Sequence, residues 1–327
     1  EKMKVYLLVV LALVLPAMAA RQAPVDAVCR LNGQWDAAAN RCTCTAPGWT
    51  GRYCEQLNLR PAPRAAVFPP GGAPSQLPAA VGATWGAAAW AENTTQFHMY
   101  AVEYMDACPM TYGTFYTSTQ IVHATSATRD GPWLRRGVAV PNAAGNPIVT
   151  RAPNGTYVLF FTNRRWTGPV RNCSRGDPAQ WAPPAYCQGC GLGISVAWAP
   201  APAGPWTVHY DAVNFSCTNP GGVLFLPNGT LVMAYKTWLP CGKCIGLVTA
   251  DDWTVWPYRT FPLGGEASCL VCQPDVEDPS QIWQDAATGT YHILFHLSGY
   301  GGAAHSRDLR SWVFNVSDHV CFGDRQR

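Results

Sequence analysis

From about residue 81 onward, short apolar runs alternate with turn-forming residues. One segment opens with Asn146-Pro147, continues as IVTRAP, turns at Asn154-Gly155 and enters the apolar run YVLFFTN. A second segment opens with Asn219-Pro220 and turns at Asn228-Gly229 before LVMAYK. Asn-Gly between two apolar runs is a hairpin signal, so each segment predicts two antiparallel strands.

The same pattern recurs further along the chain. A third segment opens with Asp278-Pro279, turns at Gly289 and enters YHILFH, while a weaker first copy contains FHMYAVEYM. Each copy is followed by another strand-like run, and the copies recur every ~60 to 75 residues, an interval typical of propeller blades. We therefore predict an all-β fold, with a β-propeller over residues 81–327; a β-sandwich is the alternative, but it does not explain the repeated polar-Pro entry.

The composition supports this fold class and limits the kinds of partner that the chain is expected to bind. Charged residues make up 13% of the chain, whereas Gly, Pro and Trp are plentiful, which favours a turn-rich β protein. The formal net charge of +3 gives no electrostatic footprint for nucleic acid or an anionic membrane. We expect no nucleic-acid partner and no membrane-spanning segment.

The first twenty residues have the order of a secretory signal. Lys2 and Lys4 precede an apolar run from Val5 to Leu15, and Ala17-Met18-Ala19 offers the small-x-small cleavage pattern. The run is shorter than the ~20 residues that span a bilayer. We expect residues 1–20 to be a signal peptide and the protein to be secreted and extracellular.

Fourteen cysteines in an exported chain indicate disulfides before metals. Three pairs have CxxC spacing (Cys187/Cys190, Cys241/Cys244 and Cys269/Cys272). A zinc site and a redox motif are the alternatives for these pairs, but Pro and Gly surround them, so loop-bracing disulfides are preferred. We expect no metal or other cofactor. Six Asn-x-Ser/Thr sequons suggest a glycoprotein; they start at Asn93, Asn154, Asn172, Asn214, Asn228 and Asn315.

Residues 25–56 form a separate cysteine-rich unit. A CxC followed by an aromatic residue, Thr-Gly and a last cysteine resembles the C-terminal half of an EGF-like module, without its first two cysteines. The resemblance implies that Cys29 pairs with Cys42 and that Cys44 pairs with Cys54. The usual EGF calcium ligands are absent, so calcium is not expected. Such a module suggests an extracellular protein partner.

Residues 57–80 are rich in Pro, Ala and Gly and predict a semi-extended linker. We therefore expect the EGF-like unit to move independently of the propeller. Deleting it would then leave the stability of the propeller nearly unchanged.

The third repeat carries a second resemblance. Its run from Val276 through Glu277-Asp278-Pro279 to Ser306-Arg307-Asp308-LRSW resembles the five-bladed β-propeller glycosidases of the arabinanase, invertase and levansucrase superfamily (family 43-like). The resemblance implies a five-bladed-type propeller and action on a polysaccharide or glycan. Four blades are visible in the sequence, and a fifth is missing or incomplete.

Glycoside hydrolysis requires two carboxyl groups, one protonated and one ionised. The blade-entry positions hold Asn146, Asn219 and Asp278, and an amide cannot shuttle a proton at neutral pH. If the protein is an enzyme, Asp278 is the candidate base or orienting carboxylate, and Glu277 or Glu103 the candidate acid. Glu266 and Asp106 are further acids near the mouth. A structural hydrogen bond at a strand start is the alternative for each acid, above all for Glu103.

Candidate sugar-binding residues complete the site. Asn146 and Asn219 could hydrogen-bond a sugar, and His292 and His296 alternate onto one face of their strand. Trp283, Trp85 and Trp90 are candidate stacking platforms, whereas the regularly placed Trp133, Trp206 and Trp312 favour packing between blades. Two functions follow: a secreted glycosidase-like propeller that acts on or binds an extracellular polysaccharide, or a non-catalytic extracellular recognition protein.

Overall fold

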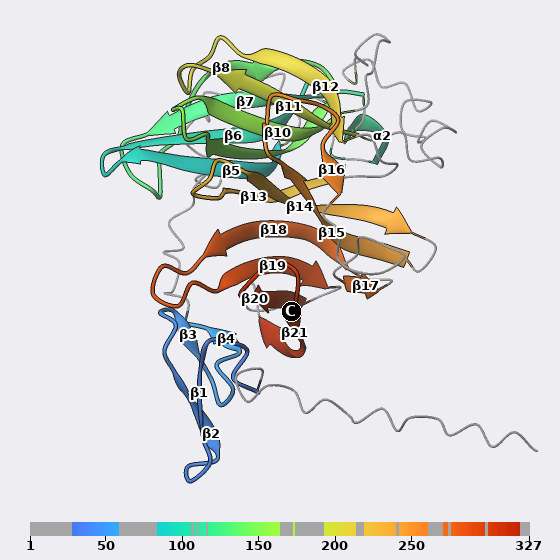
Figure 1. Ribbon diagram of the computed structural model, residues 1–327. Helices are drawn as coiled ribbons and strands as arrows, with labels where there is room; N and C mark the ends of the chain where they lie inside the picture. Colours follow the sequence, from blue (N-terminus) through green and yellow to red (C-terminus); the bar gives the residue numbers. More distant parts are fainter. Residues whose placement is uncertain are drawn as a thin grey trace, which may run out of the picture.

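The computed structural model shows an all-β chain with a β-propeller, of which it describes four blades (Figure 1). It describes residues 28–58, 84–105, 108, 110, 112–115, 117–163, 173, 193–213, 219–239, 242–260, 271–273, 276–297 and 300–320. The expected signal peptide (1–20) and most of the expected linker (57–80) lie outside these residues. No helix in the described part of the chain is long and apolar enough to cross a membrane.

The first two blades are four-stranded antiparallel sheets in sequence order. Blade 1 consists of β5 (Thr84–Asn93), β6 (Gln96–Tyr104), β7 (Thr119–Ser126) and β8 (Leu134–Val140). Blade 2 consists of β9 (Ala144–Arg151), β10 (Tyr157–Asn163), β11 (Gly193–Ala199) and β12 (Thr207–Val213). The short helix α2 (Tyr112–Phe115) lies between β6 and β7.

Blades 3 and 4 continue the series. Blade 3 consists of β13 (Asn219–Phe225), β14 (Leu231–Leu239), β15 (Gly242–Ala250), β16 (Arg259–Thr260) and β17 (Val271–Gln273), the last of which pairs with β15. Blade 4 consists of β18 (Glu277–Gln284), β19 (Tyr291–Leu297), β20 (Tyr300–Ser306) and β21 (Trp312–Val320). The first strand of each blade packs beside that of the next, from β5 through β9 and β13 to β18.

The predicted hairpin turns are present. Gly155 and Gly229 both have a φ of +88°, in the left-handed region that glycine adopts without strain. The Asn154 carboxamide accepts a hydrogen bond from the Thr156 N–H at 3.0 Å, and Asn228 does the same for Thr230 at 3.1 Å. Each Asn-Gly pair therefore closes its hairpin as the sequence predicts.

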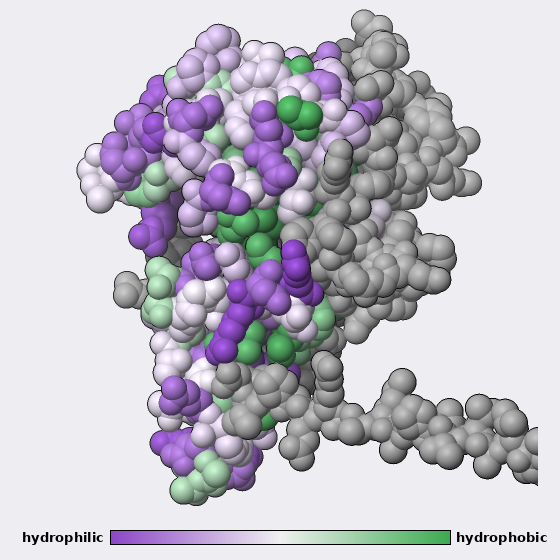
Figure 2. Space-filling view, in the orientation of Figure 1, coloured by the Kyte–Doolittle hydropathy of each residue, from purple (hydrophilic) through white to green (hydrophobic). Residues whose placement is uncertain are grey.

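The core consists of apolar layers between successive blades. Blades 1 and 2 share Tyr100 and Phe161, blades 2 and 3 share Phe160 and Met233, and blades 3 and 4 share a similar layer. Trp206 and Trp312 join apolar clusters that span two blades, which confirms the predicted packing between blades, whereas Trp133 packs against residues of blade 1 itself. In the space-filling view, hydrophobic residues gather mainly in the middle of the visible face (Figure 2).

Residues 28–58 form a small unit, here called the N-terminal module, with the hairpins β1 (Gly33–Asp36)/β2 (Arg41–Cys44) and β3 (Trp49–Thr50)/β4 (Gln56–Leu57). Cys29 is bonded to Cys42 and Cys44 to Cys54, which confirms both expected pairs. A further disulfide joins Cys108 to Cys173.

The expectation that this module is independent of the propeller is wrong. Trp49 and the module disulfides share one apolar cluster with Trp283, Leu294 and Ala303 of blade 4. The module lies against blade 4, at the opposite end of the described molecule from blades 1 and 2 (Figure 1). Prolines in the linker do not prevent this docking, because the contact is made by the module itself.

The CxxC pairs are described only in part. Cys244 is disulfide-bonded, which fits the disulfide interpretation of its pair. Cys187, Cys190, Cys241 and Cys269 lie outside the described residues, as does the side chain of Cys272.

Candidate functional site

The three blade-entry residues all lie near the start of the first strand of their blade. Asn146 is in β9, Asn219 begins β13 and Asp278 is the second residue of β18. Asn219 Nδ2 donates a hydrogen bond to Asp278 Oδ1 at 3.2 Å, so blades 3 and 4 meet through these two side chains. Asn146 Oδ1 lies 3.6 Å from the position that a Cβ would take on Gly86 of β5. Its side chain therefore faces the neighbouring blade 1.

Two residues that the sequence analysis missed complete the arrangement. Thr162 of β10 donates its hydroxyl to Asn219 Oδ1 at 3.0 Å. Lys236 of β14 places Nζ 3.3 Å from Asp278 Oδ1. Thr162, Asn219, Lys236 and Asp278 are called here the inner-strand cluster. It brings together side chains from blades 2, 3 and 4.

The hairpin register explains why these residues meet. Asn219 and Lys236 are directly paired across β13 and β14, which places both at the same end of blade 3. Thr162 pairs with Gly145, next to Asn146, across β10 and β9. Counting outward from the Asn228-Gly229 turn would give Thr237 as the partner of Asn219, because an irregularity between Pro220 and Val223 shifts the register by one residue. The hairpin pattern alone therefore does not identify Lys236.

The cluster combines one carboxylate with several hydrogen-bond donors. The Asp278 side chain is 43% exposed, whereas that of Lys236 is 11% exposed. Asp278 Oδ1 accepts from Asn219 and faces the Lys236 ammonium, while Oδ2 makes no hydrogen bond to another described residue. This oxygen can accept a hydrogen bond from a ligand.

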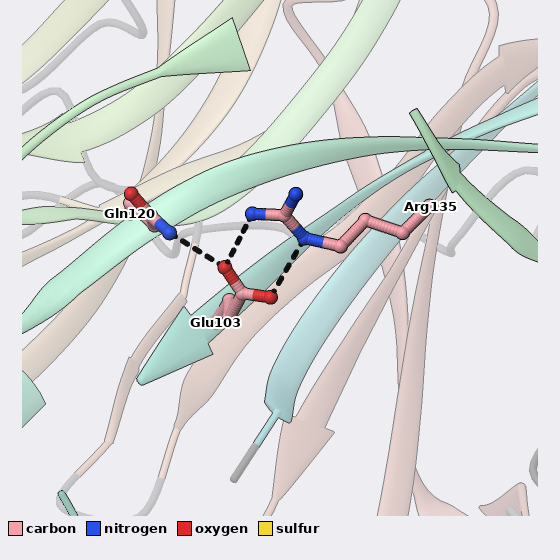
Figure 3. Close-up of polar contacts among 3 residues, drawn as sticks. All are labelled: Glu103, Gln120 and Arg135. Carbon is pink, nitrogen blue, oxygen red and sulfur yellow. Dashed lines mark hydrogen bonds and ion pairs between the residues drawn. The ribbon is translucent and has the colours of Figure 1, made fainter. Parts of the chain in front are cut away.

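Glu103, a candidate general acid, lies in a different environment (Figure 3). Arg135 of β8 binds both of its carboxylate oxygens at 2.9 Å, and Gln120 of β7 donates to Oε2 at 2.5 Å. The Glu103 residue is 1% exposed. A bidentate, buried arrangement of this kind holds a carboxylate in place. The geometry is that of a structural ion pair joining β6, β7 and β8.

The other candidate acids are described less fully. Glu277 begins β18, but its side chain lies outside the described residues, and Asp106 and Glu266 lie wholly outside them. Their assignment as acids stays a prediction.

The candidate sugar-binding residues of blade 4 are divided between two environments. His292 is 0% exposed and lies under Trp49, and Trp283 also stacks on His292, at 4.9 Å. These two side chains therefore face the N-terminal module instead of the inner-strand cluster. His296 is exposed on β19. Period-two alternation correctly gives the shared face but does not identify what covers it.

The two tryptophans of β5 also differ. Trp85 is 49% exposed, which leaves its ring accessible. Trp90 packs edge-on against Tyr157 at 6.4 Å and thus contacts blade 2. Only Trp85 remains a suitable platform for a stacked sugar.

A separate cavity of about 720 Å³ lies on blade 1, lined by residues of β6, β7, β8 and the adjoining turns, together with Ala203 of the β11–β12 turn. His98 Nδ1 and His123 Nε2 are 2.9 Å apart in its wall, together with Thr125 and Arg136. Burial lowers the pKa of His123 to about 4, so its ring is neutral at physiological pH. The repeat pattern gave no signal for this cavity, because side chains from three strands and the turns that connect them form it.

The chain matches no known family model and no curated protein sequence. Its structure is similar to a family 117 glycoside hydrolase from Zobellia galactanivorans, with 17% identity, a TM-score of 0.47 and coverage of 71% of this chain and 68% of that one. A protein of unknown function from Dyadobacter fermentans gives 10% identity, a TM-score of 0.49 and coverage of 71% and 69%.

A third similar structure is a family 43 β-xylosidase/α-arabinofuranosidase from a compost microbial metagenome. It shares 15% identity and a TM-score of 0.46, with coverage of 71% of this chain and 76% of that one. Likenesses at this level concern the general fold at most. The functional argument rests on the side chains of this chain.

Proposed function

We propose that the protein binds a carbohydrate at the inner-strand cluster. The observation that carries this proposal is the hydrogen-bonded chain Thr162–Asn219–Asp278, with Lys236 beside its exposed carboxylate. Side chains from three blades converge there, and the site needs no rearrangement to present them.

The chemistry of the cluster suits a ligand with several hydroxyl groups. A hydroxyl can donate one hydrogen bond and accept others, so it needs both kinds of partner. Asp278 Oδ2 offers an acceptor, and the Lys236 ammonium offers donors. Their charges offset each other, which favours a neutral sugar over a strongly charged ligand. Trp85 is the candidate stacking platform because its ring is accessible.

The same geometry favours recognition over hydrolysis. Hydrolysis needs a second carboxyl within about 10 Å of the first, and one of the two must be protonated. The Asp278 carboxylate is paired with Lys236, while the Glu103 carboxylate is occupied by Arg135 and Gln120. Glu277 remains the candidate acid of the alternative, a glycosidase.

The location and further partners belong to the same proposal. The signal-like order of residues 1–20 and the disulfides support a secreted, extracellular protein, since stable disulfides form in oxidising compartments. The cysteine pairing of residues 29–54 fits an EGF-like module, and such a module could recruit an extracellular protein.

A polysaccharide panel tests the proposed function. The purified full chain is compared with Asp278→Asn and with Asp251→Asn, a matched control whose carboxylate is exposed and accepts from Thr230 at 3.3 Å in a turn of blade 3. We expect retention of at least one glycan by the wild type and the control. Asp278→Asn should bind it about 10- to 100-fold more weakly, because a charge-assisted hydrogen bond contributes ~1.5–3 kcal/mol.

The panel also separates the two classes of function. Equal binding by the Asp278→Asn variant would contradict the site. New reducing ends produced by the wild type, but not by this variant, would establish the glycosidase alternative.

A further inference from the structure

A buried pair of imidazoles lies between the N-terminal module and blade 4. His292 of β19 and His305 of β20 are directly paired in register, and both are 0% exposed. Their Nδ1 atoms are 2.8 Å apart, so one ring donates a hydrogen bond to the other. The interface between the two units therefore contains two titratable groups that water does not reach.

Tryptophans from both sides enclose this pair. Trp49 of the module stacks on His292 at 5.4 Å and meets His305 edge-on at 4.8 Å. Trp283 of blade 4 stacks on His292 at 4.9 Å. His292 thus contacts one tryptophan of each unit, and undocking the module would uncover the pair.

The hydrogen bonding suits two neutral rings and leaves no place for another proton. A neutral imidazole carries one N–H, and a single proton between the two Nδ1 atoms satisfies both of them. The Nε2 atoms of both rings are buried and have no hydrogen-bond partner among the described residues. The accepting ring already carries its N–H at such an Nε2, and an added proton would place a second N–H at the other Nε2 without an acceptor, which is costly. The faces of Trp49 and Trp283 offset only part of that cost.

The charged groups around the pair act in opposite directions. Asp285, in the turn between β18 and β19, favours protonation of His292. Arg30 of the module disfavours protonation of His305, and its Nη1 donates to the Phe314 carbonyl at 3.1 Å. A cation on His305 would therefore face a second cation across the interface.

We propose that acidification releases the N-terminal module from blade 4, with His292 and His305 as the groups that take up protons and Trp49 as the contact that is lost. The two module disulfides hold the module together after its release. The device is independent of the carbohydrate site, which lies on other side chains.

The direction and the size of the pH effect on docking follow from the linkage between proton binding and docking. Burial lowers the pKa of His292 to about 4, and burial together with neighbouring positive charge lowers that of His305 well below its ordinary value of 6.5. The released form therefore binds more protons, so docking is fully favoured above pH 6.5 and weakens as the pH falls toward 4. From His292 alone, the ratio of released to docked protein should rise roughly 70-fold between pH 7.5 and 4.5.

Hydrogen–deuterium exchange of the full chain tests this, with rates corrected for the intrinsic pH dependence of exchange. Peptides covering residues 45–57 and 300–306 should lose protection by tens of fold between pH 7.5 and 4.5. The matched control is His209→Gln. It removes an imidazole of blade 2 that stacks on Trp256 at 4.0 Å. The control should behave like the wild type, whereas the double variant His292→Phe/His305→Phe should show no acid response.

Two outcomes would overturn the proposal: unchanged protection in the wild type across this range, or the same acid response in the double variant. A second measurement covers the case in which the double variant does not dock. In Trp49→Ala, histidine titration followed by NMR should return the pKa values of His292 and His305 toward 6.5. Values that stay as low as in the wild type would show that docking does not control the pKa of these groups.

Discussion

Trp49 of the N-terminal module stacks on His292 of blade 4, with ring centroids 5.4 Å apart and planes inclined by 25°. This contact makes the module part of the fold of the propeller. One face of blade 4 packs on blade 3 through Ile293 and Phe295, and the other lies against the module through Leu294 and Ala303. The module thus covers an apolar sheet face that would otherwise meet water.

Replacing Trp49 by alanine should therefore destabilise more than the module. A buried tryptophan contributes about 3–5 kcal/mol relative to alanine, and Trp49 is 6% exposed. We expect a fall of about 3 kcal/mol in the free energy of unfolding and a separate early transition of the module in calorimetry. Trp35→Ala is the control, because Trp35 stacks on Tyr53 within the module. An unchanged melting profile for Trp49→Ala would mean that the two units do not share a core.

Glu103→Gln should lower stability without affecting carbohydrate binding. The substitution leaves the Arg135 guanidinium without its carboxylate, and breaking such a buried pair costs about 3 kcal/mol. Denaturant unfolding measures the effect, and the double variant Glu103→Leu/Arg135→Met should recover part of the loss. Wild-type stability together with lost binding or activity would instead place Glu103 in the functional site.

Gly222→Ala should disrupt the contact between blades 3 and 4. A Cβ on Gly222 would lie 2.1 Å from the backbone nitrogen of Ile282, and backbone atoms cannot move aside cheaply. We expect a loss of at least about 2 kcal/mol in thermal or denaturant unfolding. Gly137→Ala is the matched control, because a Cβ there meets nothing within 4 Å. Equal stability of the two variants would contradict the close approach of β13 to β18.

The sequence predicts the blades well because hairpins are local. The Asn-Gly turns, the apolar runs that flank them and the cysteine spacing of the module lie within a few residues of one another, and the turn fixes the strand register. The partner of Glu103 is less visible: Arg135 lies two strands away on β8 and reaches the carboxylate only after three strands have paired.

The face assignments show the limit of this reasoning. Alternation correctly indicates that Trp283, His292 and Leu294 lie on the opposite face of the sheet from Ile293. It does not reveal that the N-terminal module covers the face of Trp283, His292 and Leu294. That contact joins segments more than two hundred residues apart and depends on the shape of Trp49. Lys236 also escapes strand counting, because the irregularity between Pro220 and Val223 shifts its register with Asn219 by one residue.

A crystal structure of the full chain with the oligosaccharide that it retains best tests the central claim most directly. We predict a sugar ring within hydrogen-bonding distance of Asp278 Oδ2 and Lys236 Nζ, with its glycosidic bonds intact. Sugar bound only elsewhere, for example in the cavity lined by His98 and His123, or a cleaved product at Asp278, would contradict the proposal that the inner-strand cluster is a carbohydrate-recognition site.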